Sequence, residues 1–150
     1  MKIMFVCTAN TCRSVMAEHL FRTMIQENIE ICSAGIAATD GKSPSKNTIE
    51  VCKNHGLDIS NHKATTIKSS NIKKMDLILT LEISHRNTLR KRYPDLEIYT
   101  IKEFNDVDYI YDIDDPFMCD IEVYEATFNE IKESLEKIDI AKLLRYDSKN

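Results

Sequence analysis

Cys7 and Arg13 have a spacing that suits phosphoryl chemistry, although a cysteine and an arginine six positions apart also occur by chance, so the context of the pair decides its meaning. They bound the segment CTANTCR, which lies between an apolar run at residues 3–6 and a helical pattern that begins at Ser14. A loop that curls over the start of a helix can turn its backbone N–H groups inward, and together with the helix dipole they form a nest for an anion. The planar fork of arginine can hold two phosphate oxygens. The same field stabilises a thiolate, which can then attack phosphorus in line.

The leaving group of such a reaction needs a proton, and a late aspartate can supply it. Asp115 is the best candidate because Pro116, which follows it, stiffens the loop around the carboxylate. The residues alone leave the choice open, because a solvated acidic loop is the ordinary interpretation of this segment. The other aspartates that share it are Asp106, Asp108, Asp112 and Asp114.

Composition describes an ordinary globular chain of 150 residues, with 43% hydrophobic and 29% charged residues. The net charge of -4 argues against a nucleic-acid partner. The chain has no apolar run of about 18 residues and no signal-peptide pattern at its start, so we expect no membrane partner and a cytoplasmic protein. Five cysteines with no CxxC pair predict neither a disulfide framework nor a structural zinc site. We expect no metal and no organic cofactor.

Apolar runs and helical periodicities alternate along the chain. The patterns predict strands at residues 2–6, 29–33, 75–81 and 97–101, and helices at residues 14–28, 43–56, 84–93 and 121–138. Right-handed crossovers then give an α/β fold. We expect a single three-layer domain over residues 1–150, with a four-stranded parallel sheet flanked by helices on both faces. The phosphate loop follows the first strand, where such sheets bind ligands. Glycine-rich phosphate loops are excluded, because none of the three glycines lies in residues 7–14.

The loop CTANTCRS, followed by Met16-Ala17-Glu18 and by a late Asp115-Pro116-Phe117, resembles that of the low-molecular-weight protein tyrosine phosphatases. The resemblance covers essentially the whole chain. It implies that Cys7 forms a phosphocysteine, that Arg13 and the loop amides hold the phosphoryl oxygens, and that Asp115 serves first as acid and then as base. The residues it places around the substrate are Thr8, Ala9, Asn10, Thr11, Cys12, Ser14 and Phe117.

The resemblance also implies a hydrogen-bonded network that shapes the loop. Its expected members are Asn10, Ser14, Ser33 and His62. Taken without the family, His62 is more often a structural histidine, which agrees with this role. Cys12 looks like the second loop cysteine of the family, which can pair with Cys7 under oxidation. The alternative, a free thiol that only packs, stays open.

Two loop positions depart from the family pattern. Ala9 stands where glycine is common, so the loop must avoid a positive φ there or accept strain. Val15 stands where proline is usual at the helix start. Neither change touches a reacting group.

Thr11 is the residue most informative about the substrate. Tyrosine-directed members usually carry a larger aliphatic residue there, whereas the protein arginine phosphatases of the family resemble this chain in reading CT-x-NTCRS. Residues 36–39 lack the aromatic side chain that many tyrosine-directed members use, and Met118 stands where those members often have a second aromatic residue. Acidic residues around Asp115 suit a cationic side chain. We favour phosphoarginine over phosphotyrosine; the alternative is that Thr11 is a spacer with no role in selection.

Two further functions are compatible with a phosphate loop. Thioredoxin-coupled arsenate reductases resemble this loop, but they need redox cysteines after the third strand, and residues 81–101 contain none. A phosphate-binding module without catalysis needs neither Cys7 nor Asp115. We therefore expect a monomeric enzyme that takes a phosphorylated protein and releases inorganic phosphate.

Overall fold

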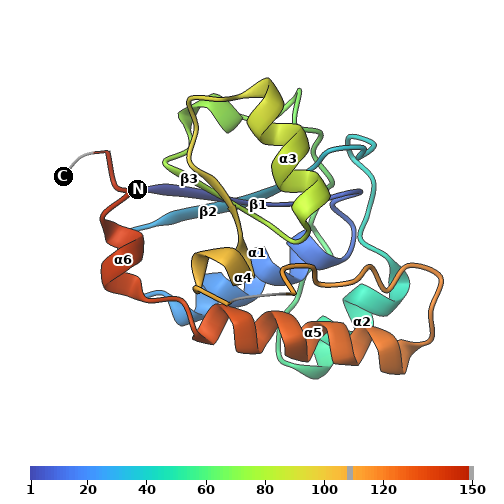
Figure 1. Ribbon diagram of the computed structural model, residues 1–150. Helices are drawn as coiled ribbons and strands as arrows, with labels where there is room; N and C mark the ends of the chain where they lie inside the picture. Colours follow the sequence, from blue (N-terminus) through green and yellow to red (C-terminus); the bar gives the residue numbers. More distant parts are fainter. Residues whose placement is uncertain (108–109, 149–150) are drawn as a thin grey trace.

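The computed structural model describes residues 1–107 and 110–148. Its centre is a sheet of four parallel strands in the order β2-β1-β3-β4 (Figure 1). The strands are β1 Lys2–Cys7, β2 Glu30–Gly35, β3 Leu77–Thr80 and β4 Ile98–Thr100. The predicted α/β class and the four-stranded parallel sheet are confirmed. The strand bounds differ from the predicted ones by one or two residues: β1 and β2 extend past their predicted ends, whereas β3 and β4 are shorter than the apolar runs that predicted them.

Alternation along β1 divides the core into two layers. Phe5 and its alternate neighbours face a cluster with α1 (Arg13–Met24), whereas Met4 and Val6 face a second cluster that includes Leu89. These side chains of β1 are at most 2% exposed. A strand buried on both faces needs helices on both sides of the sheet, as a parallel sheet normally has.

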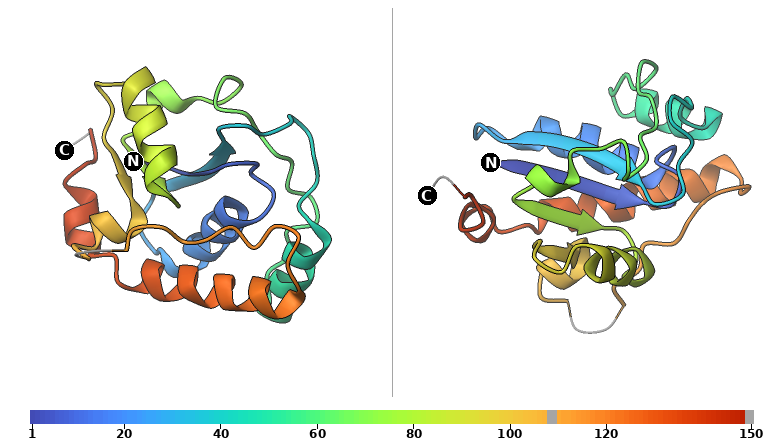
Figure 2. Two further views of the ribbon diagram at one scale, coloured as in Figure 1. Left: turned by 45° about the vertical axis from the view of Figure 1, so that its right-hand side comes forward. Right: turned by 90° about the horizontal axis from the view of Figure 1, so that it is seen from above.

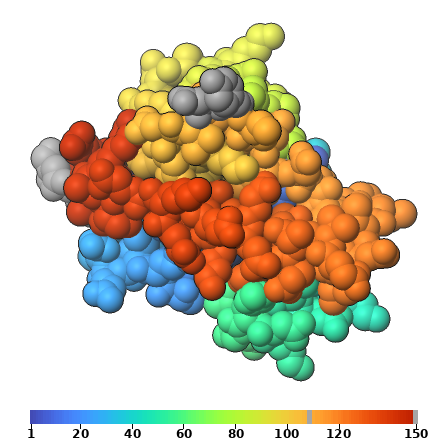
Figure 3. All heavy atoms as spheres, turned by 60° about the horizontal axis from the view of Figure 1, so that its bottom comes forward, coloured from blue at the N-terminus to red at the C-terminus, as the bar shows by residue number. Residues whose placement is uncertain are grey.

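Helices cover both faces of the sheet (Figures 1 and 2). One face carries α1, α2 (Lys46–Asn54) and α5 (Ile121–Glu136), and α5 packs on both α1 and α2. Figure 3 shows α5 lying across this side of the molecule with α2 beside one end. The opposite face carries α3 (Ile83–Arg92) and a short 3-10 helix, η1 (Ile72–Lys74). The apolar stripe at the end of the chain is confirmed as core packing, with Phe128 and Ile131 fully buried.

Several helix bounds differ from the predicted ones. The first helix ends at Met24 rather than at residue 28. Helix α2 is capped by Ser45, whose side chain accepts a bond from Thr48 N at 3.2 Å, so Pro44 precedes the helix instead of opening it. Two short helices were not predicted: α4 (Ile101–Phe104) and α6 (Ile140–Leu144). Side-chain caps from Thr100 and Asp139 hold them.

Three connections meet at the carboxyl end of β1 (Figure 1). The last residue of β1 bonds to the segment after β2, because Ile36 N donates to Cys7 O at 3.0 Å. The segment that precedes α5 joins them, because Ile113 N donates to Leu81 O at 2.9 Å just after β3. Among the described helices, none is long and apolar enough to cross a bilayer.

Candidate active site

Cys7 is the last residue of β1, and its side chain faces the start of α1. Its Sγ lies 2.9 Å from Ser14 Oγ and accepts a hydrogen bond from Asn10 N at 3.3 Å. The residue is only 2% exposed. Two short-range polar partners and the helix start therefore surround the thiol.

The loop between β1 and α1 offers unpaired backbone donors. Within residues 1–107 and 110–148, the N–H groups of Thr8, Ala9, Thr11 and Cys12 donate no hydrogen bond. The first turn of α1 begins directly after them at Arg13. Free N–H groups that surround a helix start form an anion site, because unpaired donors gain strong bonds from a phosphate.

The backbone of this loop is seated on the end of β2. Ala37 N donates to Thr8 O at 2.8 Å, and a Cβ added to Gly35 would lie 2.6 Å from the same oxygen. No larger residue than glycine therefore fits at position 35 without moving the loop. The positive φ of the loop, 55°, is taken by Asn10 and not by Ala9. The glycine-to-alanine departure at position 9 is thus accommodated without strain, because asparagine tolerates this conformation.

Arg13 is held from behind by two acceptors. Its Nη1 donates to Glu82 Oε1 at 2.7 Å and to Ile113 O at 2.8 Å. The side chain is only 2% exposed, so these bonds fix its fork in one orientation. Glu82 was not predicted as a site residue, because no local pattern links a residue after β3 to a helix start 69 positions earlier.

Asp115 is the aspartate that reaches the arginine. Its Oδ2 lies 3.5 Å from Arg13 Nη2, and its Oδ1 accepts a bond from Phe117 N at 3.1 Å. The carboxylate is 42% exposed, as an acid that must meet a substrate requires.

The neighbouring aspartates have other positions. Asp112 Oδ1 accepts a bond from Ile83 N at 2.7 Å and so caps the start of α3. Asp106 forms an ion pair with Lys142 at 3.5 Å and is 87% exposed. Asp114 is exposed, and Asp108 lies outside the described residues. Of the described aspartates in this segment, Asp115 is the one paired with Arg13.

The side chain of Asn10 joins the loop to two distant segments. Its Nδ2 donates to Ser14 Oγ at 2.8 Å and to Ser33 Oγ at 2.9 Å. Its Oδ1 accepts from Thr65 N at 3.0 Å and contacts His62 Nε2 at 3.3 Å. The structure thus brings together the four residues of the expected network, and Asn10 is its fully buried centre.

The network extends further than the sequence indicated. Ser33 Oγ donates to Glu18 Oε1 at 2.6 Å, and Arg22 Nη2 donates to Glu18 Oε2 at 2.9 Å. His19 Nε2 lies 3.1 Å from His62 Nδ1. Burial lowers the pKa of both histidines, so they are neutral near pH 7. Of the described residues, Glu18, His19 and His62 form the group that could hold a metal ion.

His85 contacts the other side of the loop, a role that was not predicted from the sequence. Its Nε2 lies 2.9 Å from Thr8 Oγ1 and 3.6 Å from Glu82 Oε2. Burial, followed by the charge of Arg13, lowers the pKa of His85 to about 4. A neutral histidine therefore positions Thr8, in a wall that it shares with Glu82 and Arg13.

Cys12 contacts side chains from two distant segments. Its Sγ lies 3.4 Å from Ser45 Oγ and 3.9 Å from Tyr124 OH, and all five cysteines are free thiols here. This agrees with the packing alternative, while oxidative pairing with Cys7 stays a prediction. The next residue back, Thr11, is 8% exposed and accepts a bond from Ser45 N at 3.0 Å.

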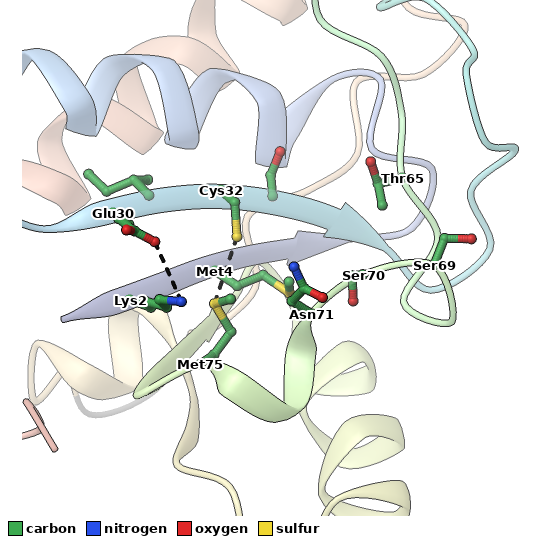
Figure 4. Close-up of a pocket in the computed structure, with 11 residues that line it drawn as sticks. Lys2, Met4, Glu30, Cys32, Thr65, Ser69, Ser70, Asn71 and Met75 are labelled. Carbon is green, nitrogen blue, oxygen red and sulfur yellow. Dashed lines mark hydrogen bonds and ion pairs between the residues drawn. The ribbon is translucent and has the colours of Figure 1, made fainter.

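The other three cysteines are not part of the loop sequence. Burial raises the pKa of Cys32 to about 11 and that of Cys52 to about 12, so both remain protonated, as expected of small buried residues. Cys32 lines a cavity of about 330 Å³ between β2 and the segment that leads to Met75 (Figure 4). Its Sγ lies 3.8 Å from Met75 Sδ. Cys119 is exposed.

The rim of the site is apolar and open. Phe117 is 63% exposed and Met118 is 86% exposed, and Met118 has a positive φ of 65°. Both follow the candidate acid directly. A side chain bound above the loop can therefore contact Phe117 without rearrangement of the core.

Comparison with known proteins assigns the chain to a family. The family described as low molecular weight phosphotyrosine protein phosphatase matches residues 2–149. The chain belongs to this family. It is 39% identical over 134 residues to the low molecular weight protein-tyrosine-phosphatase PtpB of Staphylococcus haemolyticus, covering 87% of this chain and 92% of the relative. It is 32% identical over 140 residues to the protein-arginine-phosphatase of Geobacillus stearothermophilus, covering 91% and 93%.

Solved structures agree with the fold. The C7S mutant of the YwlE arginine phosphatase, with a phosphorylated active site serine, superimposes with a TM-score of 0.87 at 28% identity and covers 99% of each chain. The suspected family is confirmed, and so are its three-layer fold and its membership among protein phosphatases.

Proposed function

We propose that this phosphatase hydrolyses phosphorylated side chains of proteins through a phosphocysteine on Cys7, and that phosphoarginine is its preferred substrate. One observation carries the proposal. A polar-contacted thiol at the end of β1, a fixed arginine fork and an exposed carboxylate 3.5 Å from that fork meet around one set of free N–H groups. These are the nucleophile, the anion clamp and the acid that phosphoryl transfer needs.

In the first step the Cys7 thiolate attacks phosphorus, an S–P bond forms, and the bond from phosphorus to the leaving atom breaks. Asp115 gives its proton to that atom, which departs as a neutral phenol or as a guanidinium group. Arg13 and the loop N–H groups stabilise the charge on the three equatorial oxygens. Ser14 and Asn10 N contact the sulfur, and they restrain it in the thiolate form before attack.

In the second step water attacks the phosphocysteine. Asp115, now ionised, takes a proton from this water, the S–P bond breaks, and inorganic phosphate leaves while the thiolate is regenerated. The 42% exposure of Asp115 supports both roles, since it can exchange its proton with solvent between turnovers. In the C7S mutant of the YwlE arginine phosphatase, the active site serine is phosphorylated, so the active site of that relative accepts a phosphoryl group.

Thr11 and the rim support the choice of phosphoarginine. Thr11 is a short β-branched residue at the loop, where a larger aliphatic side chain would fill space beside the substrate. Asp115 has acidic neighbours at Asp112 and Asp114, which favour a guanidinium leaving group by charge. One relative is named a protein-arginine-phosphatase, in agreement with this choice.

Phosphotyrosine is the second candidate, and a specific observation favours it. The exposed ring of Phe117 beside Asp115 can stack on a phenol. The relative with 39% identity is named a protein-tyrosine-phosphatase. We expect a short side chain at position 11 to favour phosphoarginine and a larger aliphatic one to favour phosphotyrosine, so a substitution of Thr11 distinguishes the two substrates.

The test compares kcat/KM on matched phosphoarginine and phosphotyrosine peptides for wild type, Thr11→Ile and Thr23→Ile. Thr11→Ile should shift the ratio toward phosphotyrosine about tenfold or more, the effect of changing one or two methyl-sized groups in a pocket. Thr23→Ile makes a similar change at an exposed position of α1 and should leave the ratio unchanged. An unaltered ratio in Thr11→Ile would remove Thr11 as the selector, and a wild type that prefers phosphotyrosine would remove phosphoarginine.

Further expectations belong to the same proposal. We expect the enzyme to act in the cytoplasm as a monomer, without metal or organic cofactor in its reaction. We also expect oxidation to join Cys7 and Cys12 reversibly, which requires Cys12 to leave its contacts with Ser45 and Tyr124. Size-exclusion chromatography and a thiol count after mild peroxide treatment test these points.

A further inference from the structure

Behind the phosphate loop, three side chains with metal-binding atoms meet. Glu18 and His19 lie on α1, and His62 comes from the loop after α2. Their candidate ligand atoms all lie within 4.8 Å of one another. No part of the proposed phosphatase reaction uses Glu18 or His19.

The separations are close to those that a zinc ion imposes. His19 Nε2 lies 3.1 Å from His62 Nδ1 and 3.1 Å from a Glu18 oxygen. Ligands bound tetrahedrally at 2.0–2.1 Å lie roughly 3.3 Å apart. The cluster therefore needs only small side-chain movements to enclose an ion, and water can complete the coordination.

Hydrogen bonds fix the tautomer of His62. The Oδ1 of Asn10 already accepts from Thr65 N, so it is an acceptor, and His62 Nε2 must donate to it. In the neutral ring the lone pair then lies on Nδ1, which faces His19 and Glu18. A ring that donates its other N–H to a carbonyl oxygen is the usual outer arrangement of a metal-bound histidine.

The neighbouring charges decide how tightly such a site binds. Glu18 supplies one negative charge, and its side chain is 9% exposed. Arg22 opposes the ion, because its Nη2 contacts the same Glu18 oxygen at 2.9 Å. Arg22 is 50% exposed and also donates to Ile31 O, so it can release the carboxylate and keep its second bond.

We propose that Glu18, His19 and His62 form a binding site for a divalent transition-metal ion of the zinc type. The site lies three hydrogen bonds from the thiol, through His62, Asn10 and Ser14 to Cys7. Metal binding does not depend on the proposed phosphatase activity. The ion would take the place of the hydrogen between His19 Nε2 and its two neighbours, and the neutral ring of His19 would then carry its proton on Nδ1.

The test uses Cys7→Ser as the background, because a free thiolate would itself bind zinc. Chelator-buffered Zn²⁺ is titrated by calorimetry into Cys7→Ser, Cys7→Ser/His19→Gln and Cys7→Ser/His55→Gln. The first protein and the His55 control should bind one Zn²⁺ per chain, and His19→Gln should weaken binding at least about 100-fold. His55 is a matched control because it pairs with Glu125 outside the cluster.

A second variant moves affinity in the opposite direction. Cys7→Ser/Arg22→Gln removes the competing cation and should bind Zn²⁺ more tightly than Cys7→Ser, which no loss of folding could imitate. Co²⁺ in place of Zn²⁺ should give visible d–d bands in Cys7→Ser but not with His19→Gln. Equal binding by the His19 variant, or no stoichiometric binding by Cys7→Ser, would overturn the proposal.

Discussion

The two sides of the phosphate loop are built differently. Behind it, the side chain of Asn10 has four polar partners and is fully buried. In front of it, Asp115 makes one contact with Arg13 at 3.5 Å and is 42% exposed, and Phe117 beside it is 63% exposed. The rear therefore holds geometry and contributes to folding, whereas the front meets the substrate and contributes little to stability. Substitutions behind should change stability and rate together, and substitutions in front should change rate alone.

The largest effect is expected at the boundary between the two sides. Cys7→Ser should lower kcat/KM on p-nitrophenyl phosphate by on the order of 10⁴-fold or more, because the hydroxyl lacks a base that would ionise it. Inorganic phosphate should still bind, measured by calorimetry, since Arg13 and the loop amides remain. Cys119→Ser changes an exposed thiol and is the matched control. Full activity in Cys7→Ser would exclude Cys7 as the nucleophile.

The front is probed by Asp115→Asn. We expect kcat to fall about 10²- to 10⁴-fold, the usual contribution of a general acid, while the melting temperature stays within about 2 °C. Asp114→Asn removes a neighbouring exposed carboxylate and should change kcat less than about threefold. If Asp114→Asn were the slower enzyme, the acid would be assigned to the wrong aspartate.

The rear is probed by Asn10→Ala. This change removes one hydrogen bond each from Ser14, Ser33, His62 and the Thr65 backbone, so the free energy of unfolding should fall by about 4 kcal/mol. Activity should fall as well. Asn10→Gly keeps the positive φ accessible and separates backbone strain from lost bonds. Urea unfolding measures both, and an unchanged midpoint in Asn10→Ala would contradict a structural role for the rear.

The smallest effect concerns pH. The pKa of His85 is lowered to about 4 in the folded protein, so between about pH 6.5 and pH 4 the unfolded chain takes up a proton that the native protein does not. The corresponding stability is complete above about pH 6.5 and is lost as pH falls to 4, by at most about 3 kcal/mol. The free energy of unfolding, measured with urea between pH 7 and pH 4, should fall less steeply with decreasing pH in His85→Gln than in wild type.

The difference between the two proteins isolates His85. The pKa values of His19 and His62 are lowered by burial as well, but both residues are present in each protein. If the free energy of unfolding had the same pH dependence in wild type and His85→Gln, His85 would not be held neutral beside Thr8.

The sequence predicted the parts of the site that are local. The spacing of Cys7 and Arg13 and the late Asp115 are visible in short segments, and the α5 stripe follows the helical period. The sheet followed from the alternation of strands and helices. The resemblance added the four members of the rear network, which no spacing alone links.

Other features depend on long-range contacts that leave no local signal. Glu82 is an ordinary acidic residue until the fold places it 2.7 Å from Arg13. In the sequence His85 is one histidine on a basic helix, and only the fold places it in contact with Thr8. The short helices α4 and α6 were missed because five or fewer residues show no periodicity, and their stability depends on single caps.

The fixed orientation of Arg13 has a consequence for how anions are chosen. A free arginine side chain loses about 2 kcal/mol of rotamer entropy when a ligand orders it. Glu82 and Ile113 impose this order during folding, so anion binding does not have to supply it. Affinity differences among tetrahedral oxyanions are then governed by how readily each one sheds its hydration shell. The affinity of the loop for different anions should therefore follow their free energies of dehydration, because the loop does not adapt its shape to each anion.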